Sequence, residues 1–316
     1  MRPGRRSGVA FALCGGLVVG GCGGGSAVTG PRVAQPLVIS LHSQGIAYDS
    51  LRQRVYVATS ASDPTHPNSV VALDPVSGSV VGSVVVGSDP ALPRISDDDQ
   101  YLYLGLLSGP TVVRINLPAL TVDQQIPLDR LPANDLAVMP GHPHTFAVSQ
   151  RGLPGVAIYD DGFKRPEFLV TGPEWLVFAD SVHLYGSDGA TLYRMTIDPY
   201  GVSLSGSSPG FDAGQGPLWW DRGRIFASSG VVVDPTSGQA VGTVHAGWVA
   251  PDGGRNRVYV LIPAGTSAAV YNESLALIGE DALPGIGDGL GYLTCLGGSA
   301  LTWATATNQV VILPLQ

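Results

Sequence analysis

The sequence predicts an all-β protein, a seven-bladed β-propeller whose last blade is closed by a strand from the N-terminal side of the domain. Two observations support this prediction. The chain contains internal repeats spaced at multiples of roughly 40 residues, and short runs of alternating apolar and polar residues are separated by Asp-Pro, Ser-Gly and Asp-Gly turns about every ten residues. A unit of this length with up to four strands is typical of one propeller blade.

Two segments of the chain repeat closely. Residues 49–57 (DSLRQRVYV) recur 203 residues further on, at 252–260, as DGGRNRVYV. Residues 71–84 (VALDPVSGSVVGSV) recur 160 residues further on, at 231–244, as VVVDPTSGQAVGTV. These displacements are close to five and four units of about 40 residues, as expected for repeated blades.

Between these segments, weaker copies predict seven strands with a central aromatic residue, each followed by a turn and a further apolar strand. The first set of strands is expected at residues 55–58, 101–105, 145–149, 183–186, 225–227, 258–261 and 300–304. The second set is expected at residues 69–73, 112–115, 156–159, 191–197, 231–233, 268–271 and 310–313. Enrichment in β-branched residues favours strands over helices. Residues 153–167 and 200–214 depart from the pattern and are expected to be loop elaborations.

The two ends of the domain predict how the ring closes. The seventh copy ends at Leu315 and Gln316, directly after its third strand, whereas residues 36–40 form an apolar strand that precedes the first copy and has no partner there. We therefore expect residues 37–41 to supply the outermost strand of the last blade. Closure of this kind removes exposed edge strands, which invite aggregation.

One part of the repeat resembles a known family. The segment Arg54-Val-Tyr-Val-Ala58, followed by an apolar strand that ends in Asp74-Pro-x-Ser-Gly78, resembles the YVTN-type β-propeller repeat. The resemblance covers nearly all of residues 37–316 and is strongest in the first, second, fifth and sixth copies. It implies a propeller like those of bacterial surface-layer and cell-surface proteins, with lactonase-like and quinoprotein-like propellers among the relatives. Such a repeat identifies the architecture, but it assigns no catalytic residue to this sequence.

Residues 1–21 have the composition of a lipoprotein signal peptide. Three arginines precede an apolar run at residues 9–19, and Val19-Gly-Gly-Cys22 resembles a bacterial lipobox. The apolar run is shorter than the about 20 residues of a spanning helix. We expect lipidation of Cys22, a flexible tether over residues 22–35, and a protein exported from the cytoplasm and lipid-anchored to a membrane of the bacterial cell envelope. The alternative is an ordinary secretory signal that is cleaved elsewhere. The sequence is compatible with an anchor in either the inner or the outer membrane.

Charge and cysteine content narrow the class of partner. The chain carries 17 Lys and Arg against 25 Asp and Glu, and removal of residues 1–21 takes away three arginines and no acid, so the net charge changes from −8 to −11. Nucleic acid is not an expected partner, because phosphate binding needs a basic stripe. Cys14, Cys22 and Cys295 offer no disulfide framework, so packing must stabilise the core.

Motifs associated with catalysis or metals lack the structural context that they need. Residues 206–210 fit the pattern G-x-S-x-G, but a loop rich in glycine and serine provides neither the strand before nor the helix after it. His142 and His144 flank a proline beside a Met-Pro-Gly turn, so a surface turn is favoured over a metal site. No Walker, Cys-x-x-Cys or haem-attachment sequence is present, and no cofactor is predicted.

Several aspartates are expected to have structural roles in turns. Asp97, Asp98 and Asp99 lack the spaced ligands of a calcium loop and are expected to be solvated. Asp74 and Asp234 occupy equivalent positions in two copies and are expected to accept hydrogen bonds within their own turns. Recurrence at equivalent positions indicates structure, because a catalytic residue would be expected in one blade only.

Two groups of side chains are candidates for a ligand face around the central channel. The first lies on loops expected at one channel mouth and comprises Asp63, His66, Asn68, Arg94, Asp135, Glu174 and Asp288. The second is a row of tryptophans in or beside the innermost strands of blades four to six, namely Trp175, Trp219, Trp220 and Trp248. Indole rings stack on sugars and other planar ligands while offering an N–H donor. The alternatives are a solvated rim for the first group and core packing for the second.

The leading functional hypothesis is a binding or scaffolding module with an envelope protein or glycan as partner. The alternative is a lactonase-like hydrolase or lyase, or a quinoprotein-like redox enzyme, with its site at the channel mouth. An enzyme requires acidic, His or Arg side chains that converge and have perturbed pKa values. A binding module requires an exposed apolar or aromatic patch instead.

Overall fold

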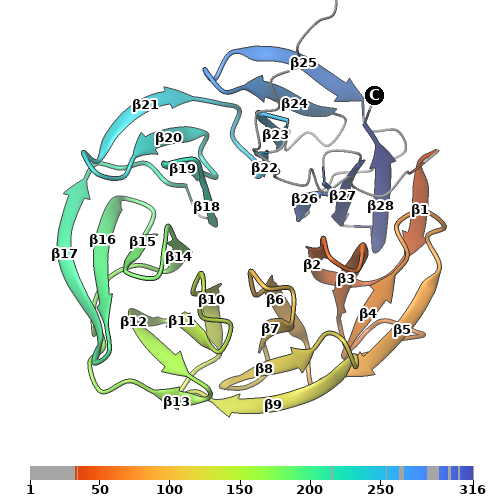
Figure 1. The fold of residues 1–316 in the computed structure, drawn as a ribbon, viewed down its shortest axis with the longest axis horizontal. Coiled ribbons are helices and arrows are strands. Elements are labelled where there is room, and N and C mark those ends of the chain that lie inside the picture. Colours follow the sequence, from red (N-terminus) through yellow and green to blue (C-terminus); the bar gives the residue numbers. More distant parts are fainter. Residues whose placement is uncertain are drawn as a thin grey trace, which may run out of the picture.

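The computed structural model describes residues 33, 35–214, 216–253, 255–262, 267–282, 292–297, 300–304 and 307–315. These residues form seven four-stranded antiparallel sheets, arranged as blades in a ring (Figure 1). The predicted seven-bladed propeller is therefore confirmed. The expected signal peptide and Cys22 lie outside the described residues. In the described part of the chain, no helix has the length and apolar character needed to cross a membrane.

Each of the first six blades is a meander that starts at the central channel and runs outward, whereas the last blade takes its outermost strand from the N-terminal side of the domain (Figure 1). The innermost strands are β2 (Ser43–Asp49), β6 (Pro90–Ile95), β10 (Ala133–Val138), β14 (Trp175–Phe178), β18 (Leu218–Asp221), β22 (Trp248–Asp252) and β26 (Leu293–Cys295). The second strands are β3 (Arg54–Thr59), β7 (Tyr101–Leu106), β11 (Thr145–Gln150), β15 (His183–Ser187), β19 (Arg224–Ala227), β23 (Arg257–Leu261) and β27 (Ala300–Ala304).

The third strands are β4 (Ser69–Leu73), β8 (Thr111–Asn116), β12 (Leu153–Asp160), β16 (Thr191–Asp198), β20 (Val231–Asp234), β24 (Ser267–Asn272) and β28 (Gln309–Pro314). The outermost strands are β5 (Val80–Val85), β9 (Thr121–Pro127), β13 (Phe163–Lys164), β17 (Gly201–Pro209), β21 (Gln239–Thr243), β25 (Leu277–Ala282) and β1 (Leu37–Ser40). Both predicted sets of strands fall within the second and third strands of the seven blades, so their assignment is confirmed.

The two segments expected to be loop elaborations are largely strands, which corrects that prediction. Residues 200–214 contain β17, which pairs along the whole of β16. Residues 153–167 contain β12 and the short β13. β17 escaped detection because most of its residues are polar or glycine and at least partly exposed, so it lacks apolar alternation. Its backbone nevertheless supplies the hydrogen bonds that a strand needs.

The ring closes as predicted, because β1 pairs antiparallel with β28. Leu37 lies opposite Ile312, and Ser40 lies opposite Gln309. Leu37 and Ile39 pack against the apolar cluster between the last and first blades, whereas Val38 between them is 56% exposed. Val33, which the sequence places in the tether, is 7% exposed and belongs to the same cluster.

The core consists of seven apolar clusters, one between each pair of adjacent blades. β3 shows how one strand serves two of them. Val55 and Val57 pack on the side of the last blade, whereas Tyr56 packs on the side of blade 2. Since successive side chains of a strand point to opposite faces, a strand buried on both faces is continuously apolar. This explains the recurrent Val-Tyr-Val of the repeat.

The recurrent Asp-Pro-x-Ser-Gly turn joins the third and outermost strands. The Oδ1 atom of Asp74 accepts hydrogen bonds from the backbone N–H groups of Val76 (2.9 Å) and Ser77 (3.0 Å). The N–H of Gly78, which has a φ of 70°, donates to the carbonyl of Asp74 at 2.8 Å. Asp234 makes the corresponding contacts in blade 5. The turn role predicted for both aspartates is confirmed.

Candidate functional site

The seven innermost strands surround a central channel with a cavity of about 500 Å³, to which each of them contributes lining residues. Residues of β10 and β14, such as Leu136 and Val177, form an aliphatic part of the wall. Arg94 on β6 is the charged side chain of the lining, and aromatic residues line the channel on blades 5 to 7. The cavity therefore has one basic side and one aromatic side.

We define the aromatic wall as Trp219, Trp220, Trp248 and Tyr292, all of which line the channel and are half-buried. The ring centroids of Trp219 and Trp248 are 5.7 Å apart, with planes at 76°. Those of Trp248 and Tyr292 are 4.7 Å apart, with planes at 56°. The edge-to-face contact of Trp219 with Trp248 and the tilted contact of Trp248 with Tyr292 are both favourable for aromatic pairs. They connect the wall from blade 5 to blade 7.

Three of the four predicted tryptophans thus belong to the channel, and the fourth does not. Trp175 begins β14 but does not line the cavity. It packs against the cluster between blades 4 and 5, as the core-packing alternative expects, and Trp220 packs against the same cluster while also lining the channel. Tyr292 was missed. It stands directly before β26, a strand of only three residues, whereas Trp248 begins β22. Alignment of the seven copies at the channel would have revealed this correspondence.

Two tyrosines, Tyr48 and Tyr292, belong to the channel lining. The hydroxyl of Tyr48 on β2 is buried and has no hydrogen-bond partner among the described residues. Burial, with the nearby Asp49 and Asp99, raises the pKa of Tyr48 to about 12. Burial also raises the pKa of Tyr292, against the opposing effect of Arg94 and Arg151. Both phenols are therefore protonated at neutral pH and can donate a hydrogen bond.

Arg94 and Asp135 are the predicted mouth residues that the structure brings together. The Nη2 atom of Arg94 lies 3.0 Å from Oδ1 of Asp135, and its Nε donates to the carbonyl of Leu136 at 3.1 Å. The carboxylate also accepts the N–H groups of Leu136 and Leu176, each at 2.8 Å. Burial raises the pKa of the fully buried Asp135, while Arg94 opposes that shift. The pair connects blades 2, 3 and 4, and both carboxylate oxygens of Asp135 accept hydrogen bonds.

Asp63 and His66 do not join that pair. Asp63 is 4% exposed and accepts the backbone N–H groups of His42 (2.9 Å), Thr65 (3.0 Å) and His66 (2.7 Å). Burial would raise the pKa of Asp63, but these N–H donors lower it overall. Neither residue lines the channel. Asp63 is therefore the internal support of its own loop.

Asn68 and Glu174 are also absent from the channel lining. The side-chain Oδ1 of Asn68 accepts the N–H of Asp89 at 2.9 Å, which joins the first blade to the start of the second. Glu174 contributes its backbone carbonyl to the side chains of Asn134 and Ser149. Asp288 lies outside the described residues. Of the side chains predicted to converge at the channel mouth, the described residues bring together one ion pair, Arg94 with Asp135.

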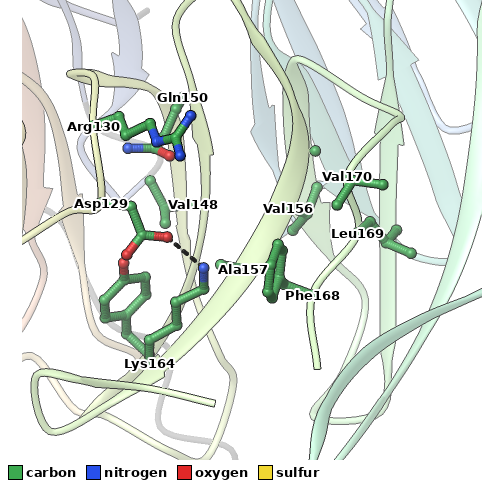
Figure 2. Close-up of a pocket in the computed structure, with 12 residues that line it drawn as sticks. Asp129, Arg130, Val148, Gln150, Val156, Ala157, Lys164, Phe168, Leu169 and Val170 are labelled. Carbon is green, nitrogen blue, oxygen red and sulfur yellow. Dashed lines mark hydrogen bonds and ion pairs between the residues drawn. The ribbon is translucent and has the colours of Figure 1, made fainter. Parts of the chain in front are cut away.

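A second cavity, of about 330 Å³, opens at the outer rim between blades 2 and 3 (Figure 2). We call it the rim pocket; it is lined among others by Asp129, Arg130, Tyr159, Lys164, Phe168 and Val170. The sequence did not predict it. Its floor comes from strands that were predicted, β11 and β12, but its entrance comes from the connection at Asp129 and Arg130 and from the irregular segment at 164–170, neither of which carries a periodic signal.

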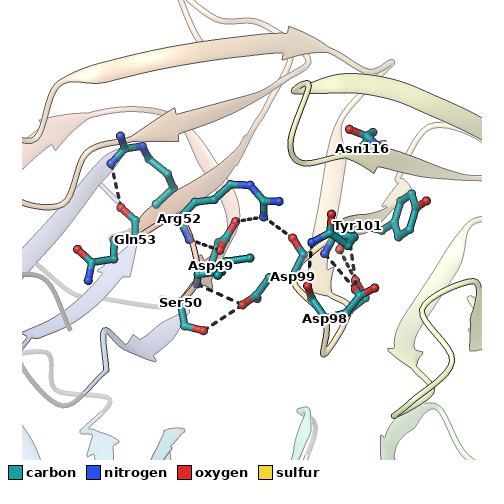
Figure 3. A network of polar contacts seen from close by, with 12 residues as sticks. Asp49, Ser50, Arg52, Gln53, Asp98, Asp99, Tyr101 and Asn116 are labelled. Carbon is teal, nitrogen blue, oxygen red and sulfur yellow. Dashed lines mark hydrogen bonds and ion pairs between the residues drawn. The ribbon is translucent and has the colours of Figure 1, made fainter. Parts of the chain in front are cut away.

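The three successive aspartates make more contacts than predicted, and Figure 3 shows those of Asp99 with the first blade. Asp97 and Asp98 are exposed, as expected, although Asp97 accepts the N–H of Gly141 in blade 3 at 2.6 Å. Asp99 is half-buried and accepts the hydroxyl of Ser50 (3.0 Å) and the N–H of Leu51 (3.2 Å) from blade 1. These contacts join neighbouring blades at their turns. The expectation of simple solvation is therefore wrong for Asp99.

The turn that holds the two histidines is a surface feature. His144 is 45% exposed, its Nδ1 atom lies 3.1 Å from Oδ1 of Asp161, and its ring meets that of Tyr101 edge to face. Across the described part of the chain, no group of three or more His, Cys, Asp or Glu side chains is placed to hold a metal ion. The G-x-S-x-G segment lies in β17 and its following turn, where Ser208 accepts a hydrogen bond from Arg194. It is part of an outer strand.

Solved structures of similar fold cover most of the chain. The β-propeller domain of Cps50 (Swd1) from Myceliophteria thermophila matches with a TM-score of 0.69 and 13% identity, over 89% of this chain and all of that one. A chain of the mitotic checkpoint complex matches with a TM-score of 0.69 and 13% identity, over 97% of this chain and 99% of that one. BamB from Moraxella catarrhalis matches with a TM-score of 0.61 and 14% identity, over 90% and 100%.

These likenesses establish the propeller fold, since identities of this size carry no further information on function. No protein-family model matches the sequence, and neither does any curated protein. The resemblance to the YVTN-type repeat therefore stays a prediction.

Proposed function

We propose that this protein is a binding or scaffolding propeller of a bacterial cell envelope, lipid-anchored through Cys22. Its partner, an envelope protein or glycan, contacts the aromatic wall of the central channel. The observation that carries this proposal is the row of half-buried rings from Trp219 through Trp248 to Tyr292 beside an open cavity. Indole and phenol groups combine apolar area with one hydrogen-bond donor each, as ligand and partner surfaces do.

The polar groups of the channel favour binding over catalysis. Asp135 is buried and already accepts three hydrogen-bond donors, so it is not free to act as a general base. The protonated hydroxyl of Tyr292 is suited to donate to a ligand oxygen. One of the similarly folded chains belongs, by its description, to the mitotic checkpoint complex, which supports a scaffolding role for this architecture.

The test is a crosslinking pull-down from intact cells with the native protein and a Trp219→Ala, Trp248→Ala double variant. Tyr200→Ser, which removes a 65% exposed aromatic side chain outside the channel, is the matched control. Loss of a specific protein or glycan in the double variant, with retention in the control, supports the proposal. Equal capture by all three proteins would show that the channel is not the binding face.

The anchor is tested separately by cell fractionation and mass spectrometry. The native protein should sediment with membranes and carry a lipid on Cys22 as its new N-terminal residue. Cys22→Ser should abolish both the modification and sedimentation with membranes. An N-terminus elsewhere, with no acyl group on Cys22, would support the ordinary secretory signal instead.

A further inference from the structure

The outer edge of blade 3 differs from those of its neighbours. Its outermost strand β13 has two residues, whereas β9 in blade 2 has seven and β17 in blade 4 has nine. After Lys164 the chain turns toward blade 4, where the N–H of Glu167 donates to the carbonyl of Tyr200 at 2.8 Å. It then returns to β12, where Leu169 forms an isolated bridge with Val156. The deviation leaves part of the blade uncovered.

The rim pocket occupies this uncovered part (Figure 2). Its floor is apolar, with Val148 and Ala157 from the second and third strands and Leu169 from the returning segment. The ring of Phe168 forms one side. A volume of about 330 Å³ lies at the lower end of the range for ligand pockets, enough for one aromatic or branched side chain and its neighbours.

Charged groups stand at the entrance of the pocket. Lys164 forms an ion pair with Asp129, and its Nζ atom lies 3.6 Å from the ring centroid of Phe168. Arg130 is exposed beside this pair, and within the described residues no acceptor is bonded to its guanidinium group. Two cations therefore face one carboxylate, so the entrance has an excess positive charge in a chain whose net charge is negative.

Two of the residues that line the pocket are exposed apolar side chains. Phe168 and Val170 are 47% and 68% exposed. Single exposed apolar residues are common on protein surfaces, but a group of them around a cavity marks an interaction site.

We propose that the rim pocket binds an extended protein segment that carries an apolar side chain next to an acidic one. The apolar side chain enters the pocket against Phe168, and the carboxylate pairs with Arg130. A guanidinium group is well suited to this contact, because it presents several N–H donors to both carboxylate oxygens. This surface is separate from the channel, so the inference does not depend on the function proposed above.

The experiment is a ligand-observed NMR titration of the full-length protein with three capped peptides. Acetyl-Gly-Phe-Glu-Gly-amide is the test peptide, the Gln analogue removes the charge, and the Ala-Glu analogue removes the ring. The test peptide should bind about tenfold more tightly than either analogue, because each loses one of the two contacts. Equal binding of the Glu and Gln peptides, or no binding of the test peptide at millimolar concentration, would overturn the proposal.

Variants at exposed positions separate this contact from a general effect on the surface. Arg130→Gln should reduce the affinity of the Glu peptide about tenfold and leave that of the Gln peptide unchanged. Asp129→Asn should increase the affinity of the Glu peptide roughly threefold, because it removes the carboxylate that competes for Lys164. Phe168→Ser should weaken both phenylalanine peptides, whereas Phe163→Ser, a change at a ring that does not line the pocket, should weaken neither. An unchanged affinity of the Glu peptide for Arg130→Gln would also overturn the proposal.

Discussion

The Cδ2 atom of Leu120 in blade 2 lies 2.7 Å from the position that a β-carbon would occupy at Gly82, on the outermost strand of blade 1. The same relationship recurs between Leu275 in blade 6 and Gly242 in blade 5, at 2.5 Å. Both leucines have positive φ values, of 49° and 61°. The second glycine of the repeat, at positions 82 and 242, therefore recurs because a leucine of the next blade occupies the space that a side chain would need.

Gly82→Val should destabilise the propeller by about 2 kcal/mol, since the new side chain overlaps Leu120 in a packed contact. The loss should be smaller in a Leu120→Ala background. Gly279→Val on β25 is the control, because nothing lies within 4 Å of a β-carbon at Gly279. Denaturant unfolding of the wild type, the two single variants and the double variant measures the coupling between positions 82 and 120. Equal losses in both backgrounds would show that Leu120 is not the cause.

Arg94→Gln should lower the free energy of unfolding by about 3 kcal/mol at pH 7, because it leaves the buried carboxylate of Asp135 without its cation. Burial raises the pKa of Asp135, so the native state binds a proton more readily than the unfolded chain. Stability therefore increases as the pH falls through that raised pKa. Without Arg94, the pKa of Asp135 is higher in the variant than in the native protein. The difference in the free energy of unfolding between the two proteins should therefore become smaller as the pH falls from 7 to about 5. A deficit that is independent of pH would mean that the arginine acts by packing alone.

Asp63→Ala should open the loop between β3 and β4, because three backbone N–H groups lose their acceptor at a cost of about 2 kcal/mol. Amide hydrogen exchange at Thr65 and His66 should accelerate, while exchange in β11 stays unchanged. Because the N–H donors hold the pKa of Asp63 below its ordinary value, this support persists at neutral pH and is lost only as the pH falls through that lowered pKa. Unchanged exchange at both residues would contradict the supporting role.

Alternation along β1 predicts opposite effects for adjacent residues. Leu37→Ser and Ile39→Ser should each lower the free energy of unfolding by about 1–2 kcal/mol, because both side chains pack against the seam between the last and first blades. Val38→Ser, between them, should change it by less than about 0.5 kcal/mol, because its side chain is exposed. Urea midpoints of the three variants test the pattern. Similar losses at all three positions would argue against the register in which Val38 faces solvent.

Sequence patterns were sufficient for the fold because the blades repeat a physical requirement. Val55, Tyr56 and Val57 are apolar in succession since each faces one of two neighbouring blades, and the same constraint recurs at 258–260. Asp74 and Asp234 recur because the same turn needs the same acceptor. β17 carries no such constraint on its exposed faces, so its residues resembled a loop.

The site was less accessible to prediction because it depends on which way a side chain points at the channel. Trp175 and Trp248 both begin innermost strands and both pack against a cluster between blades, yet of the two only Trp248 lines the channel. The position of Asp63 in its loop favoured a place at the channel mouth, but its carboxylate accepts three backbone N–H groups and is buried within the loop. Arg94 and Asp135 are 41 positions apart, and only the ring brings them within 3.0 Å.

The pairing of β1 with β28 also sets the order in which the protein can assemble. Ser40 and Gln309 are among the first and last residues of the ring, so their contact has nearly the largest sequence separation that the domain allows. Contacts of this kind form slowly, because the chain between them must be ordered before they bring any gain. Until β28 has been synthesised and has paired with β1, each of these two strands has an unpaired edge that can pair with another chain. Closure is therefore the late and concentration-sensitive step of folding.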